Sequence, residues 1–123
     1  MEDYFSYTKE LFDPSKVTEK PEVFKGLRVL DFSHVIYGPT AARLLSQYGA
    51  EVIKFELPFT GDLWRFGVYW GTFWKHSSVC FQFVQYNKYF VGLNLKLPKA
   101  KDLIYQLAEN ADVVVENLSL IHI

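Results

Sequence analysis

The sequence predicts an α/β fold, an open and mostly parallel sheet with helices on both faces. Residues 27–56 and residues 90–116 each read as a strand, a helix of about ten residues and a second strand. Parallel strands joined by a helix form βαβ units of nearly fixed handedness, and two such units in one chain favour a layered sheet. The chain has 123 residues, a length that accommodates one domain at most.

The first unit has clear boundaries. Residues 27–32 are apolar and partly β-branched, which predicts a buried strand, and a turn follows. Pro39 is the predicted first helical residue, because its missing N–H has no intrahelical partner there. Apolar residues then recur at helical spacing until Gly49, which stands where a left-handed residue ends a helix. Residues 51–56 form the second predicted strand.

The second unit repeats this order. Residues 90–95 predict a strand, Pro98 opens a helix that runs through Ala108, and residues 112–116 predict another buried strand. The aromatic stretch between the two units, residues 57–89, predicts only a short helix around residues 78–86. No internal repeat or low-complexity segment interrupts the pattern.

The N-terminal segment differs in composition from the rest. Residues 1–25 mix polar and aromatic side chains with Pro14 and Pro21, and they predict an extension that covers a neighbour, with a short helix near residues 4–12. Aromatic residues make up 18% of the chain. Because so short a chain buries only about two-thirds of its unfolded surface, we expect some of these rings to be covered by another polypeptide segment.

Charge and cysteine content exclude several classes of protein. The 13 basic and 14 acidic residues form no basic run that follows nucleic-acid phosphates, so we expect no nucleic-acid partner. The single cysteine, Cys80, excludes an internal disulfide and a cysteine-rich metal site. No apolar run approaches the roughly 18 residues that span a membrane, and residues 1–9 lack a secretory signal. We therefore expect a cytoplasmic protein without a membrane partner.

Common nucleotide-binding motifs do not occur in the sequence. No GxGxxG follows the first predicted strand and no GxxxxGK[ST] occurs anywhere, which disfavours a generic nucleotide-binding module. The three histidines, His34, His76 and His122, are far apart and lack the i, i+4 spacing of a metal site on a helix. We expect no metal site.

The predicted carboxyl edge of the sheet carries polar residues. Asp31 and Glu56 end neighbouring strands, where ligands of open α/β sheets bind, although capping and solvation explain these carboxylates better from the residues alone. The turn at residues 33–39 joins the same edge to a helix N-terminus, whose free N–H groups suit a phosphate or carbonyl oxygen. His34 in this turn is open to two interpretations, a capping or packed histidine and a ligand contact.

Several short segments, taken together, resemble the opening of the class III CoA-transferases. That family includes formyl-CoA transferase, the carnitine and benzylsuccinate CoA-transferases and α-methylacyl-CoA racemase. The resemblance covers residues 24–117 in order and with family-like spacing. Its segments are GLRVLDFSHV at 26–35, Gly38-Pro39, GAEVIKFE at 49–56, Gly61-Asp62 with Arg65, Asn87-Lys88, LNLK at 93–96 and ADVVVEN at 111–117.

The resemblance implies that residues 26–117 are the N-terminal part of a Rossmann-like CoA-binding domain in an interlocked dimer or heteromer. It implies transfer of CoA between an acyl-CoA and a carboxylic acid through an aspartyl-CoA thioester, with no tightly bound cofactor. The family's nucleophilic aspartate lies beyond Ile123, so we expect this truncated chain alone to be inactive. The residues that match the family's CoA or substrate contacts are His34, Ile36, Tyr37, Leu57, Leu93, Asn94, Leu95, Lys96 and Asn117.

Three departures from the family pattern leave alternatives open. Ile36 stands where formyl-CoA transferase has a glutamine that guards its intermediates, so the resemblance leaves that particular substrate open. Leu57 stands where that enzyme has a basic side chain for the nucleotide end, and Tyr89-Phe90 replace the small or basic residues that usually follow Asn87-Lys88. A non-catalytic subunit of a heteromeric transferase and an acyl-CoA racemase remain alternatives. An aspartate at the nucleophile position of the complete sequence would favour an enzyme over the non-catalytic subunit.

The last six residues, 118–123, leave the family pattern. After Glu116-Asn117 that pattern has an aromatic residue and a Pro-Gly turn, whereas this chain reads LSLIHI. The codons CTG TCT CTT ATA CAC ATC, the end of a transposon-based sequencing adapter, encode those six residues. We therefore expect a non-native tail, the alternative being an ordinary divergent strand. Amplification of the locus tests this expectation, since a stop codon after Ile123 in genomic DNA would contradict it.

Overall fold

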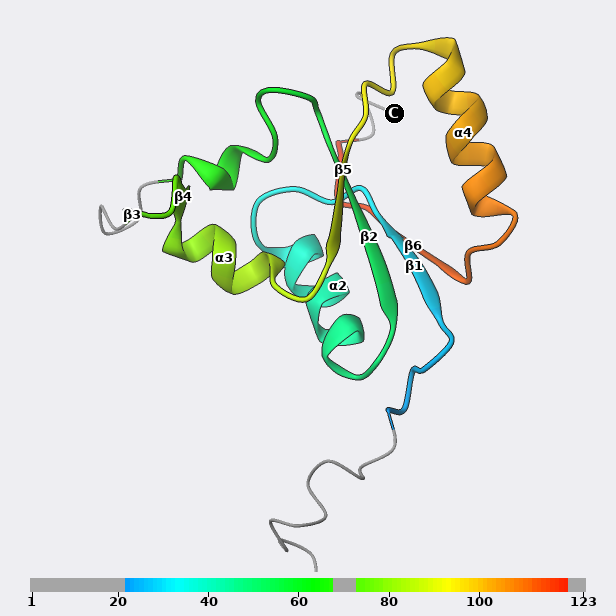
Figure 1. Ribbon diagram of the computed structural model, residues 1–123, viewed down its shortest axis with the longest axis horizontal. Coiled ribbons are helices and arrows are strands. Elements are labelled where there is room, and N and C mark those ends of the chain that lie inside the picture. The colour runs from blue at the N-terminus through cyan, green and yellow to red at the C-terminus, as the bar shows by residue number, and fades with distance from the viewer. Residues whose placement is uncertain (1–21, 68–72, 120–123) are drawn as a thin grey trace, which may run out of the picture.

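A parallel sheet forms the centre of the computed structural model, which describes residues 22–67 and 73–119 (Figure 1). Within these residues the sheet has four strands in the order β5-β2-β1-β6, and each neighbouring pair is parallel. The expected α/β fold with an open parallel sheet is confirmed. The strands are β1 (Arg28–Asp31), β2 (Glu51–Glu56), β5 (Tyr89–Gly92) and β6 (Val113–Val115).

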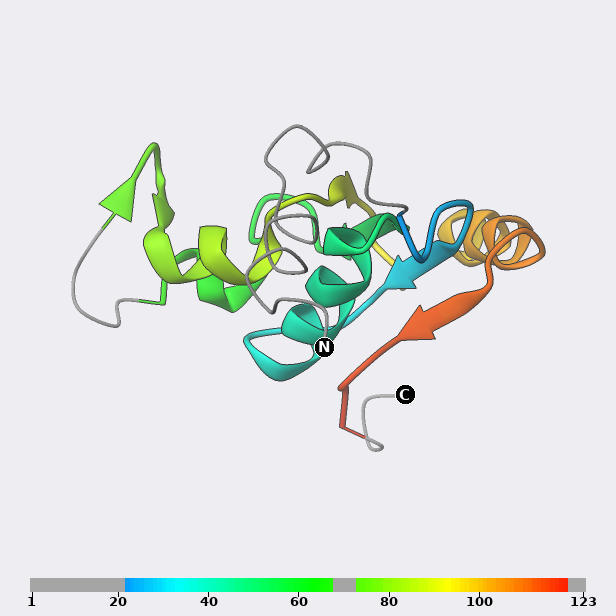
Figure 2. The same cartoon turned by 90° about the horizontal axis from the view of Figure 1, so that it is seen from below.

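Helices lie on both faces of the sheet, as predicted. α2 (Tyr37–Gln47) and α3 (Val79–Gln85) contact each other on one face, and α4 (Pro98–Ala108) lies on the other (Figures 1 and 2). The two strands joined by α4 are parallel but not neighbours. Because β1 and β2 pair with each other, β5 takes the free edge of β2 and β6 takes the free edge of β1, so α4 crosses the sheet.

Helix α2 begins earlier than predicted. Its N-cap is Ile36, which makes no side-chain cap within the described residues, and Pro39 is the third helical residue instead of the first. A proline there is tolerated because the first-turn N–H groups have no intrahelical partner. The predicted end of the helix is confirmed, since Tyr48 is the C-cap and Gly49 has a φ of 101°.

The Gly49 turn gives a first testable prediction. A Cβ at Gly49 would lie 2.5 Å from the Cβ of Glu22, and the left-handed φ strains any L-residue. We expect Gly49→Ala to lower the free energy of unfolding of the complete protein by about 1–2 kcal/mol in urea titrations. Gly92→Ala is the matched control, because the nearest described atom, in Pro58, would be 3.9 Å from the added Cβ. Equal losses in the two variants would contradict the prediction.

The second unit is partly as predicted. The helix at Pro98–Ala108 is confirmed, and α3 lies within its predicted range with Ser78 as N-cap. β5 ends at Gly92 instead of continuing to residue 95, because the side chain of Asn94 accepts the N–H of Lys96 and turns the chain. The expectation that β6 is buried is wrong, since Val114 is 56% exposed in this edge strand.

The apolar core lies between the sheet and α2. Val29 and Val52 point from β1 and β2 toward Ala42, and Ala50 completes the buried cluster. The residues on the opposite face of the same strands, such as Phe55, point away from α2 because side chains alternate along a strand. Asp31 and Lys54 lie on the same face of the sheet as Val29 and Val52. The face that packs on α2 is therefore apolar in the core and charged at the carboxyl edge of the sheet.

The aromatic stretch forms small elements that the sequence did not predict. They are η2 (Leu63–Arg65) and a hairpin of β3 (Phe73–Trp74) and β4 (Ser77–Ser78). The short helix predicted near residues 4–12 lies outside the described residues, and the division into extension, domain and tail stays a prediction. Among the helices that the structure describes, none has the length and apolar character needed to cross a membrane.

Candidate functional site

A cavity of about 510 Å³ opens at the carboxyl edge of the sheet, on the side of α4. Phe32 and Phe55 stack with their ring centroids 4.8 Å apart and form an apolar wall. Lys101 of α4 also lines the cavity. Six of the predicted site residues line this cavity: His34, Leu57, Leu93, Asn94, Leu95 and Lys96.

Asn117 and the start of α2 complete the set of predicted residues. The Asn117 side chain accepts the N–H of His34 at 2.7 Å and donates to the His34 carbonyl at 2.9 Å, so it clamps the first turn from β6. Ile36 and Tyr37 follow in the same turn but do not belong to the described lining, and Tyr37 is 87% exposed. The structure thus brings six of the nine residues together, ties a seventh to them through His34 and leaves Ile36 and Tyr37 outside the described lining.

The first turn has a strained backbone. Val35 has a φ of 71°, a left-handed value that is unfavourable for a β-branched residue. Its N–H points to the carboxylate of Asp62, at 3.1 and 3.2 Å from the two oxygens. Asp62 is fully buried, and it also accepts the N–H of Trp64 at 2.8 Å at the start of η2. A side chain from a distant loop therefore stabilises the turn.

Beneath the turn lies a buried ion cluster of Asp31, Lys54, Asp62 and Lys88. Lys88 Nζ lies 2.8 Å from Asp31, and Lys54 Nζ lies 3.5 Å from Asp62 and 3.9 Å from Asp31. The four side chains are all fully buried. Lys54 also donates to the Ser33 carbonyl. Two cations and two carboxylates balance each other, which is the condition for keeping charges away from water.

Lys88 connects three elements of the cluster. Besides Asp31, its ammonium donates to the Pro39 carbonyl at 2.9 Å and to Gln85 Oε1 at 2.7 Å, so it joins β1, α2 and α3. Burial lowers the pKa of Lys88 below its ordinary value, and the neighbouring Asp31 carboxylate opposes that shift. The cluster fixes where α2 starts relative to the sheet.

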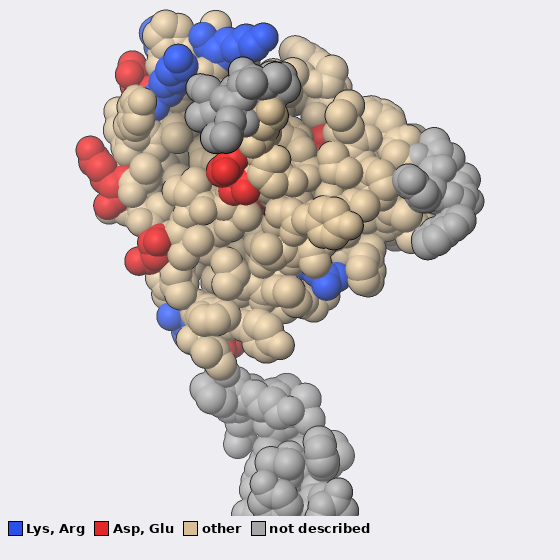
Figure 3. Space-filling model, turned by 180° about the vertical axis from the view of Figure 1, so that it is seen from behind, with Lys and Arg blue, Asp and Glu red and all other residues tan. Residues whose placement is uncertain are grey.

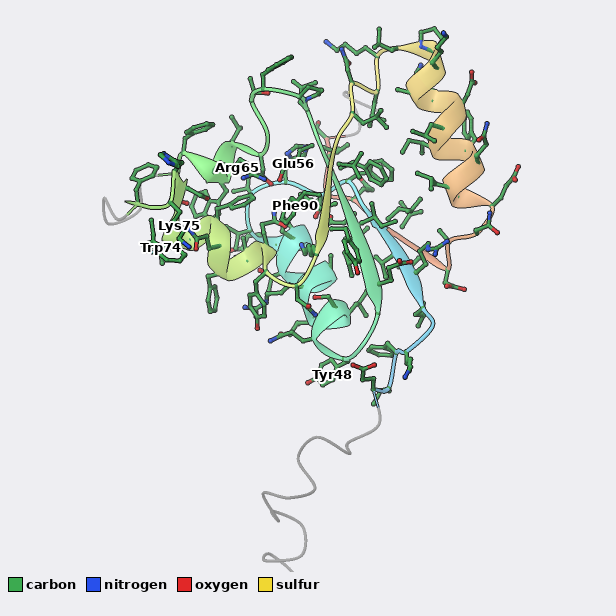
Figure 4. All side chains as sticks on the ribbon, viewed as in Figure 1. Tyr48, Glu56, Arg65, Trp74, Lys75 and Phe90 are labelled. Carbon is green, nitrogen blue, oxygen red and sulfur yellow. The ribbon has the colours of Figure 1, made fainter. Side chains whose placement is uncertain are left out.

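Glu56 ends β2 in a second ion pair, which is partly buried. Its carboxylate accepts two hydrogen bonds from Arg65, at 2.7 and 3.1 Å, and the guanidinium lies over the rings of Phe81 and Phe90 (Figure 4). Glu56 is 8% exposed and Asp31 is fully buried. The interpretation of these strand-end carboxylates as solvated caps is therefore wrong, because both are buried and paired.

Sequence reasoning missed the buried ion cluster. Lys54 stands directly beside Asp31 in the register of β1 and β2, and a lysine between the apolar residues Ile53 and Phe55 was the available signal. Lys88 and Asp62 come from loops with no regular period, and only the three-dimensional structure places them. Lys101 was missed as a lining residue, although it lies only a few residues after the LNLK segment, in the first turns of α4.

The margin of the cavity is basic. Lys96, Lys99 and Lys101 are exposed, and basic side chains gather over the beginning of α4 (Figure 3). Lys96 and Lys101 line the cavity. An apolar interior beside exposed ammonium groups suits a ligand with a long neutral arm and phosphate groups. No cluster of three or more His, Cys, Asp or Glu side chains among the described residues is arranged to hold a metal ion.

Comparison with known proteins gives a family match over most of the chain. The model of CoA-transferase family III matches residues 24–122. A formyl-CoA:oxalate CoA-transferase from Rhodopseudomonas palustris (strain HaA2) is 42% identical over 92 residues, which are 75% of this chain and 21% of that relative. One of the same name from Afipia carboxidovorans is 39% identical over 98 residues, 80% of this chain and 23% of that relative.

Solved structures agree with the sequence matches. A CaiB/BaiF family protein from Brucella suis superposes with a TM-score of 0.71 at 28% identity, over 82% of this chain and 27% of that one. A hypothetical protein from Mycobacterium tuberculosis gives a TM-score of 0.60 at 35% identity, over 73% and 24% of the two chains. The chain therefore spans between a fifth and a quarter of the curated relatives described above.

Proposed function

Because the chain belongs to CoA-transferase family III, we propose that the complete protein transfers CoA between an acyl-CoA and a carboxylic acid. We propose that an aspartyl-CoA thioester is the intermediate, with the nucleophilic aspartate provided by a part of the protein that this chain does not span. This segment would contribute part of the CoA-binding domain. The relatives that match it carry the name of a CoA-transferase, which supports the general reaction.

The observation that carries the proposal is the convergence of six predicted residues on one cavity. They come from the ends of β1, β2 and β5, which meet at the edge where open α/β sheets bind ligands. The apolar walls formed by Leu57, Leu93 and Leu95 suit the neutral arm of CoA, and Lys96 at the margin suits its phosphates.

Lys101 explains how the site would work without a cation at position 57. Leu57 stands where the family resemblance has a basic side chain, and it lines the same cavity as Lys101. We propose that Lys101 and Lys96 together provide the positive charge for the nucleotide end. An ammonium group acts as a point charge, so its exact attachment point matters less than that of a bidentate guanidinium.

The quaternary proposal follows from exposed apolar surface. Tyr89 and Phe90 on β5 and Val114 on β6 are 67%, 44% and 56% exposed in the isolated chain. Large apolar groups at sheet edges are usually covered by other chain segments. We propose that further segments of the complete protein and a second subunit, as a homodimer or a heteromer, cover them. We place this protein in the cytoplasm.

Loss of the Lys96 charge should weaken CoA binding. We expect Lys96→Ala in the complete protein to raise the Kd for CoA by about three- to tenfold in calorimetry, since an exposed charge-assisted contact to phosphate is lost. Lys99→Ala is the matched control, because Lys99 is an exposed lysine in the first turn of α4, three residues after Lys96, and lies outside the described lining. Equal affinity in Lys96→Ala and the parent protein would remove Lys96 from the site.

The reaction itself is tested by exchange of CoA. The complete protein is incubated with formyl-CoA and oxalate, and then with other pairs of acyl-CoA and carboxylate, and new thioesters are followed by mass spectrometry. A CoA adduct on an aspartate of the protein is expected under single-turnover conditions. Deuterium uptake at the α-carbon of an acyl-CoA without any exchange would instead favour the racemase alternative.

A further inference from the structure

We propose that Asp62 is a positioning residue that holds the strained turn at Val35 in the shape required by the adjoining cavity. The inference rests on the proposed function, because that cavity is the proposed CoA site. Asp62 lies outside the described lining of the cavity and would act through Val35 and His34 without touching the ligand. Its contribution is therefore separate from that of the lining residues.

Val35 is held between two fixed neighbours. On one side, both backbone polar groups of His34 are clamped by Asn117. On the other side, α2 begins after Ile36. The φ of 71° at Val35 is unfavourable by itself, and the N–H is directed at both oxygens of Asp62. Without that acceptor the backbone would relax toward an ordinary negative φ, because nothing else described binds this N–H.

Asp62 is well anchored for this task. Its oxygens accept from Trp64 N at 2.8 Å and from Gln85 Nε2 at 3.3 Å, and Lys54 Nζ lies at 3.5 Å. The side chain has no exposed surface. A carboxylate fixed by donors on several sides cannot follow the turn if the turn moves, so it restrains Val35 instead of adapting to it.

The turn controls the wall of the cavity. His34 lines the cavity, and its side chain is 35% exposed and has its Nδ1 3.8 Å from Asp62 Oδ2. A change of φ at Val35 rotates the peptide that follows His34 and shifts the start of α2. Loss of the Asp62 carboxylate should therefore alter the cavity although every lining side chain is still present.

The proposal is tested by a double-mutant cycle, because glycine adopts a φ of 71° without strain. CoA affinity is measured by calorimetry and the unfolding midpoint by thermal denaturation, on the complete protein. Asp62→Ala should weaken CoA binding about tenfold or more, and Val35→Gly alone by less than about threefold. The double variant should recover at least about threefold of the affinity lost in Asp62→Ala, and part of the lost thermal stability.

Asp31→Ala provides the matched control. Asp31 is also fully buried and belongs to the same ion cluster, but its partners among the described residues are Ser33, Lys54 and Lys88. Val35→Gly should not rescue Asp31→Ala. Because the added glycine raises the entropy of the unfolded chain equally in both backgrounds, that effect cancels when the two rescues are compared. Equal rescue of both variants, or no rescue of either, would overturn the proposal.

Two further results distinguish a failure of the role proposed for Asp62 from a failure of the proposed function. If Asp62→Ala fails to fold, Asp62→Asn replaces it, and a stability coupling between positions 35 and 62 is still expected, because the amide oxygen is a weaker acceptor. If the parent protein does not bind CoA, the proposed function fails. The coupling of unfolding midpoints then decides by itself whether Asp62 holds the turn.

Discussion

Lys88→Met is expected to lower the free energy of unfolding of the complete protein by about 3–5 kcal/mol. The substitution leaves Asp31 charged and buried without its nearest cation, which lies at 2.8 Å. It also removes the donor for the Pro39 carbonyl and for Gln85 Oε1. Urea unfolding measures the change as a lower midpoint at an unchanged slope.

The matched variants separate charge from packing. Lys99→Met, on the exposed surface of α4, should change stability by less than about 0.5 kcal/mol. Asp31→Asn combined with Lys88→Met should cost less than the sum of the two single changes, because an unpaired buried charge is then avoided. A Lys88→Met protein as stable as Lys99→Met would show that water or another group reaches Asp31.

The pH dependence follows from the direction of the Lys88 shift. Burial lowers the pKa of Lys88 in the folded state below the ordinary 10.5. Between the lowered value and 10.5, the unfolded chain binds more protons at this residue than the folded protein, so stability rises with pH. Parent protein should therefore gain stability relative to Lys88→Met as the pH rises through that window. A loss of relative stability there would mean that Asp31 outweighs burial and raises the pKa.

Periodic features of the fold were predictable from the sequence. β2 and α4 have the predicted boundaries because each is bounded by a clear signal, Gly49 before the strand and Pro98 at the helix start. The order of the strands was not predictable from local pattern. The order depends on whether each later strand pairs with the free edge of β1 or with that of β2. A helix with the sequence of α4 could equally well have joined two neighbouring strands.

The candidate site was predictable from the sequence where its residues follow the ends of strands. His34, Leu57 and the segment at 93–96 come directly after β1, β2 and β5, and parallel strands bring their carboxyl ends to one edge. The charges beneath the site were not predictable in the same way. Asp62 and Lys88 are placed by loop geometry, and neither a period nor a capping signal indicates that a polar loop residue points inward.

The two carboxylates of the buried ion cluster, Asp31 and Asp62, are expected to support the site in different ways. The Asp31 and Lys88 pair joins secondary-structure elements, so its loss should reduce global stability. The contact between Asp62 and Val35 holds a local strained turn, so its loss should act mainly on the cavity. Asp31→Ala should therefore act mainly on stability and Asp62→Ala mainly on CoA affinity, although both residues are fully buried.

Exposed sheet edges and an uncovered helix govern the expected behaviour of the 123-residue chain alone. β5 and β6 are the edges of the described sheet, and their exposed apolar side chains are Tyr89, Phe90 and Val114. In α4, Tyr105 is 70% exposed and Leu103 is 42% exposed, while Ala100 is buried. Bare strand edges beside apolar patches favour self-association.

We therefore expect the 123-residue chain, expressed alone, to be insoluble or a loosely packed aggregate without transferase activity. Ordering the backbone costs roughly 1–2 kcal/mol per residue, and the small core around Val29 and Val52 offsets too little of that cost. Size-exclusion chromatography and thermal denaturation measure the first expectation, with the complete protein as control. A monodisperse monomer with a sharp cooperative transition would contradict it. Acyl transfer by the purified chain would contradict the stronger expectation, that the nucleophilic aspartate belongs to a segment this chain does not span.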